Sequence, residues 1–147
     1  MRRYFLLLIT LLWMPLAAAR ADTPIFSEAD GIAIGGYDTV AFFEVGRPTR
    51  GETGFAVMWK GVTWLFVSDE NRQMFESNPR AYAPQYGGYC AFAVSNGYLM
   101  NGDPSAWEIV DDRLYLTFSP AVHRVWNRDR DAHIQSGNTN WPVVLRD

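Results

Sequence analysis

Cysteine, lysine and histidine are the scarcest reactive residues of this 147-residue chain. It has one cysteine, Cys90, one lysine, Lys60, and two histidines, His123 and His133. A single thiol has no partner within its own chain, so an internal disulfide framework is excluded. Basic residues number 13 against 16 acidic ones, and they are scattered. Because nucleic-acid phosphates are bound by clustered Lys and Arg, this balance argues against a nucleic-acid partner.

Long apolar runs are also lacking, except at the start of the chain. Two arginines precede an almost wholly apolar run over residues 4–16, and Ala-Arg-Ala at 19–21 is the small-x-small pattern of a signal-peptidase site. We therefore predict a signal peptide over residues 1–21 and an exported protein, periplasmic or secreted. The run contains Pro15 and is short for a bilayer span, so we expect no membrane span in the mature form. An uncleaved signal anchor is the alternative.

Aromatic residues, by contrast, are plentiful. Six Trp, seven Tyr and nine Phe supply bulky side chains for the core of a chain that is long enough for one domain. An aromatic-lined ligand pocket is a second use of such rings. Removing the predicted signal peptide leaves 10 basic and 16 acidic residues, so the mature protein is expected to be acidic.

The first clear structural pattern is a β-hairpin followed by a helix. Residues 55–59 and 62–67 are rich in β-branched and aromatic residues and flank the turn Lys60-Gly61. Ser68 then supplies a helix N-cap, and acidic residues follow it in the first turn, where the helix dipole favours them. Asn78-Pro79 ends the predicted helix.

The same order recurs further along the chain. Strands predicted over residues 107–110 and 114–118 flank Asp111-Asp112, and Ser119-Pro120 begins a second helix. The apolar face of this helix is expected to consist of Val122, Val125 and Trp126. At a shift of 51 residues the two units superpose without a gap, in character more than in identity. The similarity is either a tandem duplication or chance, and both interpretations remain open.

These patterns predict an α+β fold, as one small domain of antiparallel hairpins packed on two or three helices. We place this domain over residues 36–142. An N-terminal lead-in segment covers residues 22–35, and a short C-terminal tail covers 143–147.

The segment around the thiol is the strongest candidate for a site. It consists of Tyr86, Gly87, Gly88, Tyr89 and Cys90. The two glycines permit positive φ and a run of backbone N–H groups that can stabilise a thiolate or an anion. Cys90 is either a buried small hydrophobe or a functional thiol, and the sequence leaves both open. After this segment, Asn96-Gly97 predicts a hairpin turn between strands near residues 92–94 and 98–100.

Several motifs resemble the YHS domain family. They are Trp59-Lys60-Gly61, Trp64-Leu65-Phe66-Val67-Ser68 and the Phe-x-x-Asn-Pro-x-x-Tyr pattern of residues 75–82. Three flanking segments, residues 36–43, 86–91 and 102–107, resemble the exported, stand-alone branch of that family. The motifs run from about residue 36 to residue 107, and the similarity extends to Trp141-Pro142.

The metal site of the family does not carry over to this chain residue by residue. Metal-handling YHS domains use cysteine ligands, and the matching positions here are Ala41, Val67 and Asn71, which cannot replace soft thiolates. A different site could combine Cys90 with His123 and hold a copper or zinc ion. The family motifs further suggest, as neighbours of the loop, Tyr37, Asp38, Asp103 and Trp107. Helix or turn caps are the alternative roles of the two aspartates.

An enzyme-like pattern is present but weaker. Residues 93–97 are a variant of the Gly-x-Ser-x-Gly elbow, with Asp111 or Asp112 and a histidine downstream, but that elbow needs a larger parallel sheet than this chain can form. We therefore predict an exported small binding or accessory protein that presents the Tyr/Gly/Cys loop to a metal ion, a small ligand or a partner protein. The alternative is a thiol-dependent enzyme or redox protein centred on Cys90.

Overall fold

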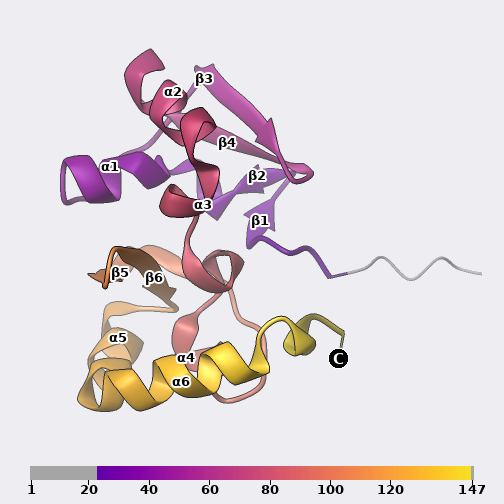
Figure 1. Ribbon diagram of the computed structural model, residues 1–147, viewed down its shortest axis with the longest axis vertical. Coiled ribbons are helices and arrows are strands. Elements are labelled where there is room, and N and C mark those ends of the chain that lie inside the picture. The colour runs from indigo at the N-terminus through magenta and orange to yellow at the C-terminus, as the bar shows by residue number, and fades with distance from the viewer. Residues whose placement is uncertain (1–22, 147) are drawn as a thin grey trace, which may run out of the picture.

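The chain folds as a small α+β domain. A computed structural model describes residues 23–146, and the predicted signal peptide lies outside the described residues (Figure 1). Within that range no helix is both long and apolar enough to cross a membrane. The elements in order are β1 (Glu28–Ala29), β2 (Ile32–Ala33), η1 (Ile34–Gly36), α1 (Thr39–Glu44), β3 (Glu52–Trp59), β4 (Val62–Phe66), α2 (Asp69–Ser77), α3 (Pro79–Tyr82), η2 (Gln85–Gly88), α4 (Ala91–Ser95), β5 (Asp103–Val110), β6 (Arg113–Thr117), α5 (Pro120–Trp126), η3 (Asn127–Asp129), α6 (Arg130–Asn140) and η4 (Val143–Arg146).

Two sheets divide the domain into halves. The first sheet has the order β1-β2-β4-β3, in which β2 runs parallel to β4 and the other neighbours are antiparallel. The second is the antiparallel hairpin β5-β6. In Figure 1 the first sheet lies with α1 and α2 in one half, and β5-β6 lies with α4, α5 and α6 in the other. The predicted α+β class with antiparallel hairpins is confirmed.

The predicted lead-in segment belongs to the first sheet. Its residues Glu28–Ala29 and Ile32–Ala33 form β1 and β2, and Ile32 pairs with Thr63 of β4. Just before them, Phe26 is buried in the first hydrophobic cluster. The boundary expected at residue 36 therefore separates strands that share one sheet.

The hairpins predicted around Lys60-Gly61 and Asp111-Asp112 are both present, with the same kind of turn. Lys60 and Gly61 have φ of 49° and 84°, and Asp111 and Asp112 have φ of 49° and 58°. Two consecutive left-handed residues give the turn whose twist matches that of antiparallel strands. Glycine and aspartate tolerate this region better than most residues do, which explains Gly61, Asp111 and Asp112 but not Lys60.

The helix that follows each hairpin is capped as predicted. The hydroxyls of Ser68 and Ser119 each accept a hydrogen bond of 3.2 Å from the backbone N–H three residues further on. Phe75 of α2 and Trp126 of α5 are both fully buried. The expectation that Val125 also points inward is wrong, since 42% of it is exposed. One residue advances a helix by about 100°, so a short helix that buries Trp126 turns Val125 towards solvent.

The two halves repeat one another closely. Strands β3-β4 and β5-β6 pair in the same register at a shift of 51 residues, and both ladders break at the same place, between Glu52 and Ala56 and between Asp103 and Trp107. The repeat also extends upstream at a shift of 52, where η1 and η2 each contain three successive residues with positive φ before a short helix. The equivalent pairs are Ile34 and Tyr86, Gly35 and Gly87, Gly36 and Gly88, Tyr37 and Tyr89, and Asp38 and Cys90.

We call residues 34–75 the first repeat and residues 86–126 the second. A backbone bond fixes the same point in each: Asp38 N–H donates to Thr49 O at 2.9 Å, and Cys90 N–H donates to Met100 O at 2.7 Å. Two unrelated hairpins need not share a turn, a strand irregularity, a cap and an upstream loop. The structure therefore supports the duplication over chance similarity.

The hairpin predicted after the thiol is wrong. Residues 91–95 form α4, and Asn96 caps the end of that helix instead of opening a turn between strands. The helix packs on α6, a partner about 40 residues further along the chain. Over only three residues, the alternating apolar pattern of a strand cannot be distinguished from one buried turn of a helix. Here the packing against α6 determines that the segment is helical.

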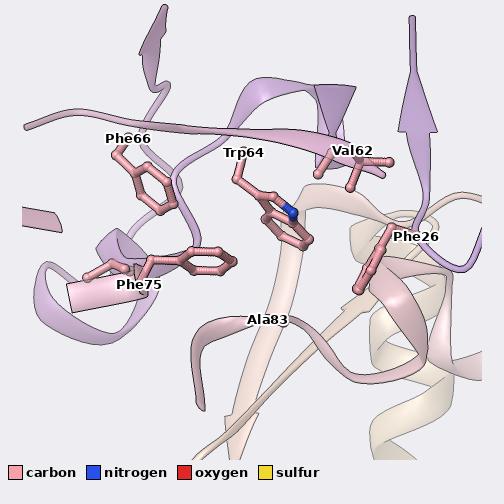
Figure 2. Packing of buried hydrophobic residues seen from close by; sticks show 8 residues of the cluster. Phe26, Val62, Trp64, Phe66, Phe75 and Ala83 are labelled. Atoms are coloured by element: carbon pink, nitrogen blue, oxygen red, sulfur yellow. The ribbon is translucent and has the colours of Figure 1, made fainter. Parts of the chain in front are cut away.

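Aromatic rings fill the core of the first repeat. Figure 2 shows the rings of Trp64, Phe66 and Phe75 gathered between β4 and α2, and the Phe75 ring lies 5.1 Å from Trp64 and 5.0 Å from Phe66, centroid to centroid. A second cluster fills the other half. A third joins the two repeats and consists of Ile34, Phe42, Leu114 and Leu116. The halves are therefore packed into one body.

Candidate functional site

Asp38 is a buried structural cap. Its Oδ1 accepts backbone N–H bonds from Val40 at 2.8 Å and Ala41 at 3.1 Å, at the start of α1. Its Oδ2 accepts from Val67 N–H at 2.9 Å and from the Asn71 amide at 2.7 Å. The carboxylate is fully buried and has these four donors. It ties the loop, α1, β4 and α2 of the first repeat together, which is the capping role that the sequence left open.

Cys90 occupies the equivalent position in the second repeat. The residue is 1% exposed, and its Sγ accepts a hydrogen bond of 3.2 Å from Phe118 N–H. Phe118 corresponds to Val67, so the sulfur replaces one carboxylate oxygen of Asp38. The start of α4, unlike that of α1, receives no bond from the capping side chain. The position is therefore structural in both repeats, and the thiol is enclosed.

The glycine pair is covered by the N-terminal segment. Ser27 N–H donates to Gly87 O at 2.8 Å, and the Tyr89 hydroxyl donates to Pro24 O at 2.8 Å. A Cβ on Gly87 would collide with the carbonyl oxygen of Ile25, and φ at Gly87 is +62°. The absence of a side chain lets the N-terminal segment pass against the loop. The loop that we expected to be presented to a metal ion, a small ligand or a partner protein is thus packed beneath residues 24–27.

Tyr86 fastens the loop to α6. Its hydroxyl lies 3.1 Å from Ile134 O and 3.0 Å from Asn138 Oδ1, and Gly137 leaves the space in which the ring sits. Burial raises the pKa of the Tyr86 phenol well above its usual range. The group therefore remains a neutral donor at ordinary pH.

The other residues suggested by the family motifs have separate surroundings. The Arg50 guanidinium lies 4.8 Å above the ring of Tyr37, and Asp103 accepts a bond of 2.8 Å from Ser105 N–H at the start of β5. The Trp107 ring packs edge-on against Phe42, with centroids 5.1 Å apart. These contacts do not converge on the thiol. Tyr37 and Asp38 instead occupy, in the first repeat, the positions that Tyr89 and Cys90 occupy in the second.

His123 faces a carboxylate rather than the sulfur. Its Nε2 lies 3.5 Å from Glu108 Oε2, and the Arg130 guanidinium donates to Glu108 Oε1 at 3.0 Å. Within residues 23–146 no three His, Cys, Asp or Glu side chains come close enough together to hold a metal ion. A copper or zinc site of Cys90 and His123 would require both side chains to leave their present partners.

The serine of the elbow-like pattern, Ser95, does meet one of the two downstream histidines, His133. Ser95 Oγ lies 3.0 Å from His133 Nδ1 and donates to Phe92 O at 2.8 Å. Ser95 is at the end of α4 and His133 is in α6, so the pair joins these helices. Asp111 and Asp112 lie in the β5-β6 turn and form no described bond with His133, so the Ser-Asp-His arrangement is not assembled. The pair serves helix packing.

A cleft lies beside the loop, where four segments of the chain meet: residues 25–26, 60, 80–87 and 138–141. Its volume is about 270 Å³, and Tyr86 and Gly87 of the predicted loop form part of its wall. The apolar part of the wall consists of Ile25, Phe26, Ala83, Pro84 and Trp141. The polar part consists of Lys60, Arg80, Gln85 and Asn138. The sequence offers no signal for this cleft except the loop itself, because its other residues are far apart in the chain.

No protein-family model, no curated protein and no solved structure matches this chain. The YHS resemblance therefore stays a prediction from the motifs.

Proposed function

We propose that this chain is a small exported protein that binds a small ligand in the cleft beside Tyr86 and Gly87. The observation that carries the proposal is the make-up of the cleft: an aromatic and apolar wall with a few polar groups, at the junction of packed segments. This is the usual composition of small-molecule sites, which favour such junctions.

The position of the loop supports binding in preference to catalysis. Cys90 is enclosed and accepts a backbone N–H bond, so the thiol has no open path to a substrate. Gly87, by contrast, reaches the cleft wall through its backbone. The loop's contribution to a ligand would thus come from Tyr86 and Gly87, since Cys90 does not line the cleft.

Export and membership of the YHS family are part of the same proposal. Export is supported by the charged start, the apolar run and the Ala-Arg-Ala pattern of residues 1–21. Family membership is supported by the motifs between residues 36 and 107. Sequencing the N-terminus of the protein from the exported fraction tests the first point, and a start at Asp22 is expected.

Filling the cleft tests the binding function. Gln85 is half-buried in the cleft wall, so Gln85→Trp should occupy the space with an indole. Gln135→Trp makes the same change at an exposed position of α6 that does not line the cleft. A small-molecule library is screened against the mature protein by NMR shift mapping. Hits at the cleft should disappear in Gln85→Trp and persist in Gln135→Trp. Hits confined to other surfaces, or unaffected by Gln85→Trp, would overturn the proposal.

A further inference from the structure

We propose that the ligand of this cleft is a compact organic anion, with one acidic group attached to a flat apolar body. The inference rests on the proposed function and goes further, because it names the chemical class of the ligand.

The charge of the cleft wall supports an anion. Lys60 and Arg80 line the cleft, and none of its described lining residues is acidic. Neither cation forms an ion pair with an acidic residue of the described part of the chain. The chain as a whole is acidic, so two cations facing one cleft form a local exception. Such a site attracts small anions and repels cations.

The Lys60 side chain is exposed, and its ammonium lies over an aromatic ring. It comes from the tight β3-β4 turn, and its Nζ lies 5.1 Å from the centre of the Trp59 ring. A turn with two left-handed residues holds the backbone, and the ring limits the directions the side chain can take. Less conformational freedom then remains to be lost when a ligand binds.

Side-chain amides supply hydrogen-bond donors on the same wall. Asn138 Oδ1 already lies in a bond with the Tyr86 hydroxyl, which leaves the Asn138 amide N–H₂ for a ligand. Burial raises the pKa of Tyr86, so no phenolate charge opposes an anion in the cleft. Amide donors beside two cations suit a carboxylate.

Size and shape define the remainder of the ligand. Trp141 is a half-buried aromatic residue of the wall, and Ala83 and Pro84 add apolar surface. A volume of about 270 Å³ lies just below the range typical of drug-sized ligands. A single ring or a short branched chain with one acidic group fits these limits.

Matched probes separate charge from shape. The mature protein is titrated with benzoate, with its neutral analogue benzamide and with inorganic phosphate. Because Lys60 is the only lysine, reductive ¹³C-methylation places one side-chain signal at the cleft, and the labelled α-amino group acts as an internal reference. Benzoate should shift the Lys60 signal and bind more tightly than both other probes.

Charge-removing variants test the roles of the two cations. Lys60→Gln and Arg80→Gln should each weaken benzoate binding about threefold, and together about tenfold, without changing the affinity for benzamide. Arg124→Gln removes an equal charge from an exposed position of α5 outside the cleft and should have no effect. The affinity for benzoate should fall as the salt concentration is raised.

The outcomes distinguish this inference from the proposed function. If benzamide binds as tightly as benzoate and Gln85→Trp abolishes both, the cleft binds ligands and the anionic class is wrong. If phosphate binds as tightly as benzoate, the apolar body is wrong. If no probe or library compound binds in the cleft, both proposals fail together.

Discussion

Asp38 and Cys90 are equivalent positions with different chemistry. Each follows a Gly-Gly-Tyr loop and precedes a short helix, and each accepts a bond from the residue after the second strand of its repeat. Asp38 has four donors, whereas one described donor reaches the Cys90 sulfur. The backbone of the repeat therefore persists when its most polar contact is replaced by a soft, weakly accepting atom.

The turns of the two repeats differ in charge as well. Lys60-Gly61 in the first repeat corresponds to Asp111-Asp112 in the second, with closely similar φ angles. Only the first of these turns lines the cleft beside the loop. Duplicated backbones thus supply equivalent positions, and individual side chains give each copy its own surface.

The largest expected effect comes from removing the carboxylate of the first repeat. Asp38→Ala leaves buried N–H groups without an acceptor and should lower the free energy of unfolding by about 4 kcal/mol. Asp38→Asn keeps the shape and one acceptor and should cost less. Urea unfolding followed by tryptophan fluorescence measures both variants. A loss below that of Cys90→Ala would reverse the expected ranking of the two positions.

The paired glycines offer a matched comparison. Gly35 and Gly87 have φ of +63° and +62°, but only Gly87 lies against a neighbouring backbone. Gly35→Ala should cost about 1 kcal/mol of backbone strain, and Gly87→Ala about 3 kcal/mol, because it also displaces residues 24–27. Hydrogen exchange should find the Ser27 amide less protected in Gly87→Ala alone. If the two variants lost the same unfolding free energy, the packing of residues 24–27 against Gly87 would contribute nothing to stability.

The thiol of the second repeat should behave as a packed acceptor. Cys90→Ala removes the sulfur and leaves Phe118 N–H unpaired, for an expected loss of about 2 kcal/mol. Cys90→Ser can still accept that bond and should lose less. In the native protein a disulfide-exchange reagent should react slowly, and its rate should rise with denaturant. Rapid labelling without denaturant would restore the thiol-dependent alternative.

The serine caps should contribute equally in the two repeats. Ser68→Ala and Ser119→Ala each remove one hydroxyl acceptor at 3.2 Å, so each should lower stability by about 1 kcal/mol. Thermal unfolding by circular dichroism measures the pair. The double variant should show the sum of the two losses, since the caps share no partner.

The last expected effect concerns the tyrosines of the second repeat. It changes the stability of the protein only in alkaline solution. Burial raises the pKa of Tyr86, Tyr89 and Tyr115 above the usual value. A raised pKa favours the protonated phenol in the folded state, so this contribution is complete below about pH 10 and is lost as the pH rises beyond it. A pH series of urea unfolding should show this decline, and Tyr86→Phe should make it shallower.

Much of the fold follows from local signals. The strands around Lys60-Gly61 and Asp111-Asp112 and the caps Ser68 and Ser119 were predictable because turn and cap preferences act over a few residues. The helix α4 was not, because its five residues carry no period long enough to identify. The location of the site was only partly predictable: Tyr86 and Gly87 reach the cleft, and Cys90 turns into the core.

The sequence by itself determined the two hairpin-and-helix units and the likeness between them, since neighbouring residues fix turns, caps and strand pairing. Tertiary structure alone decided that the Tyr86–Cys90 loop is buried, because residues 24–27 and α6 cover it from distant parts of the chain. It also formed the cleft, where Lys60, Arg80 and Trp141 meet although nothing in their local sequence relates them. Burial depends on packing between remote segments, and short-range patterns do not record that packing.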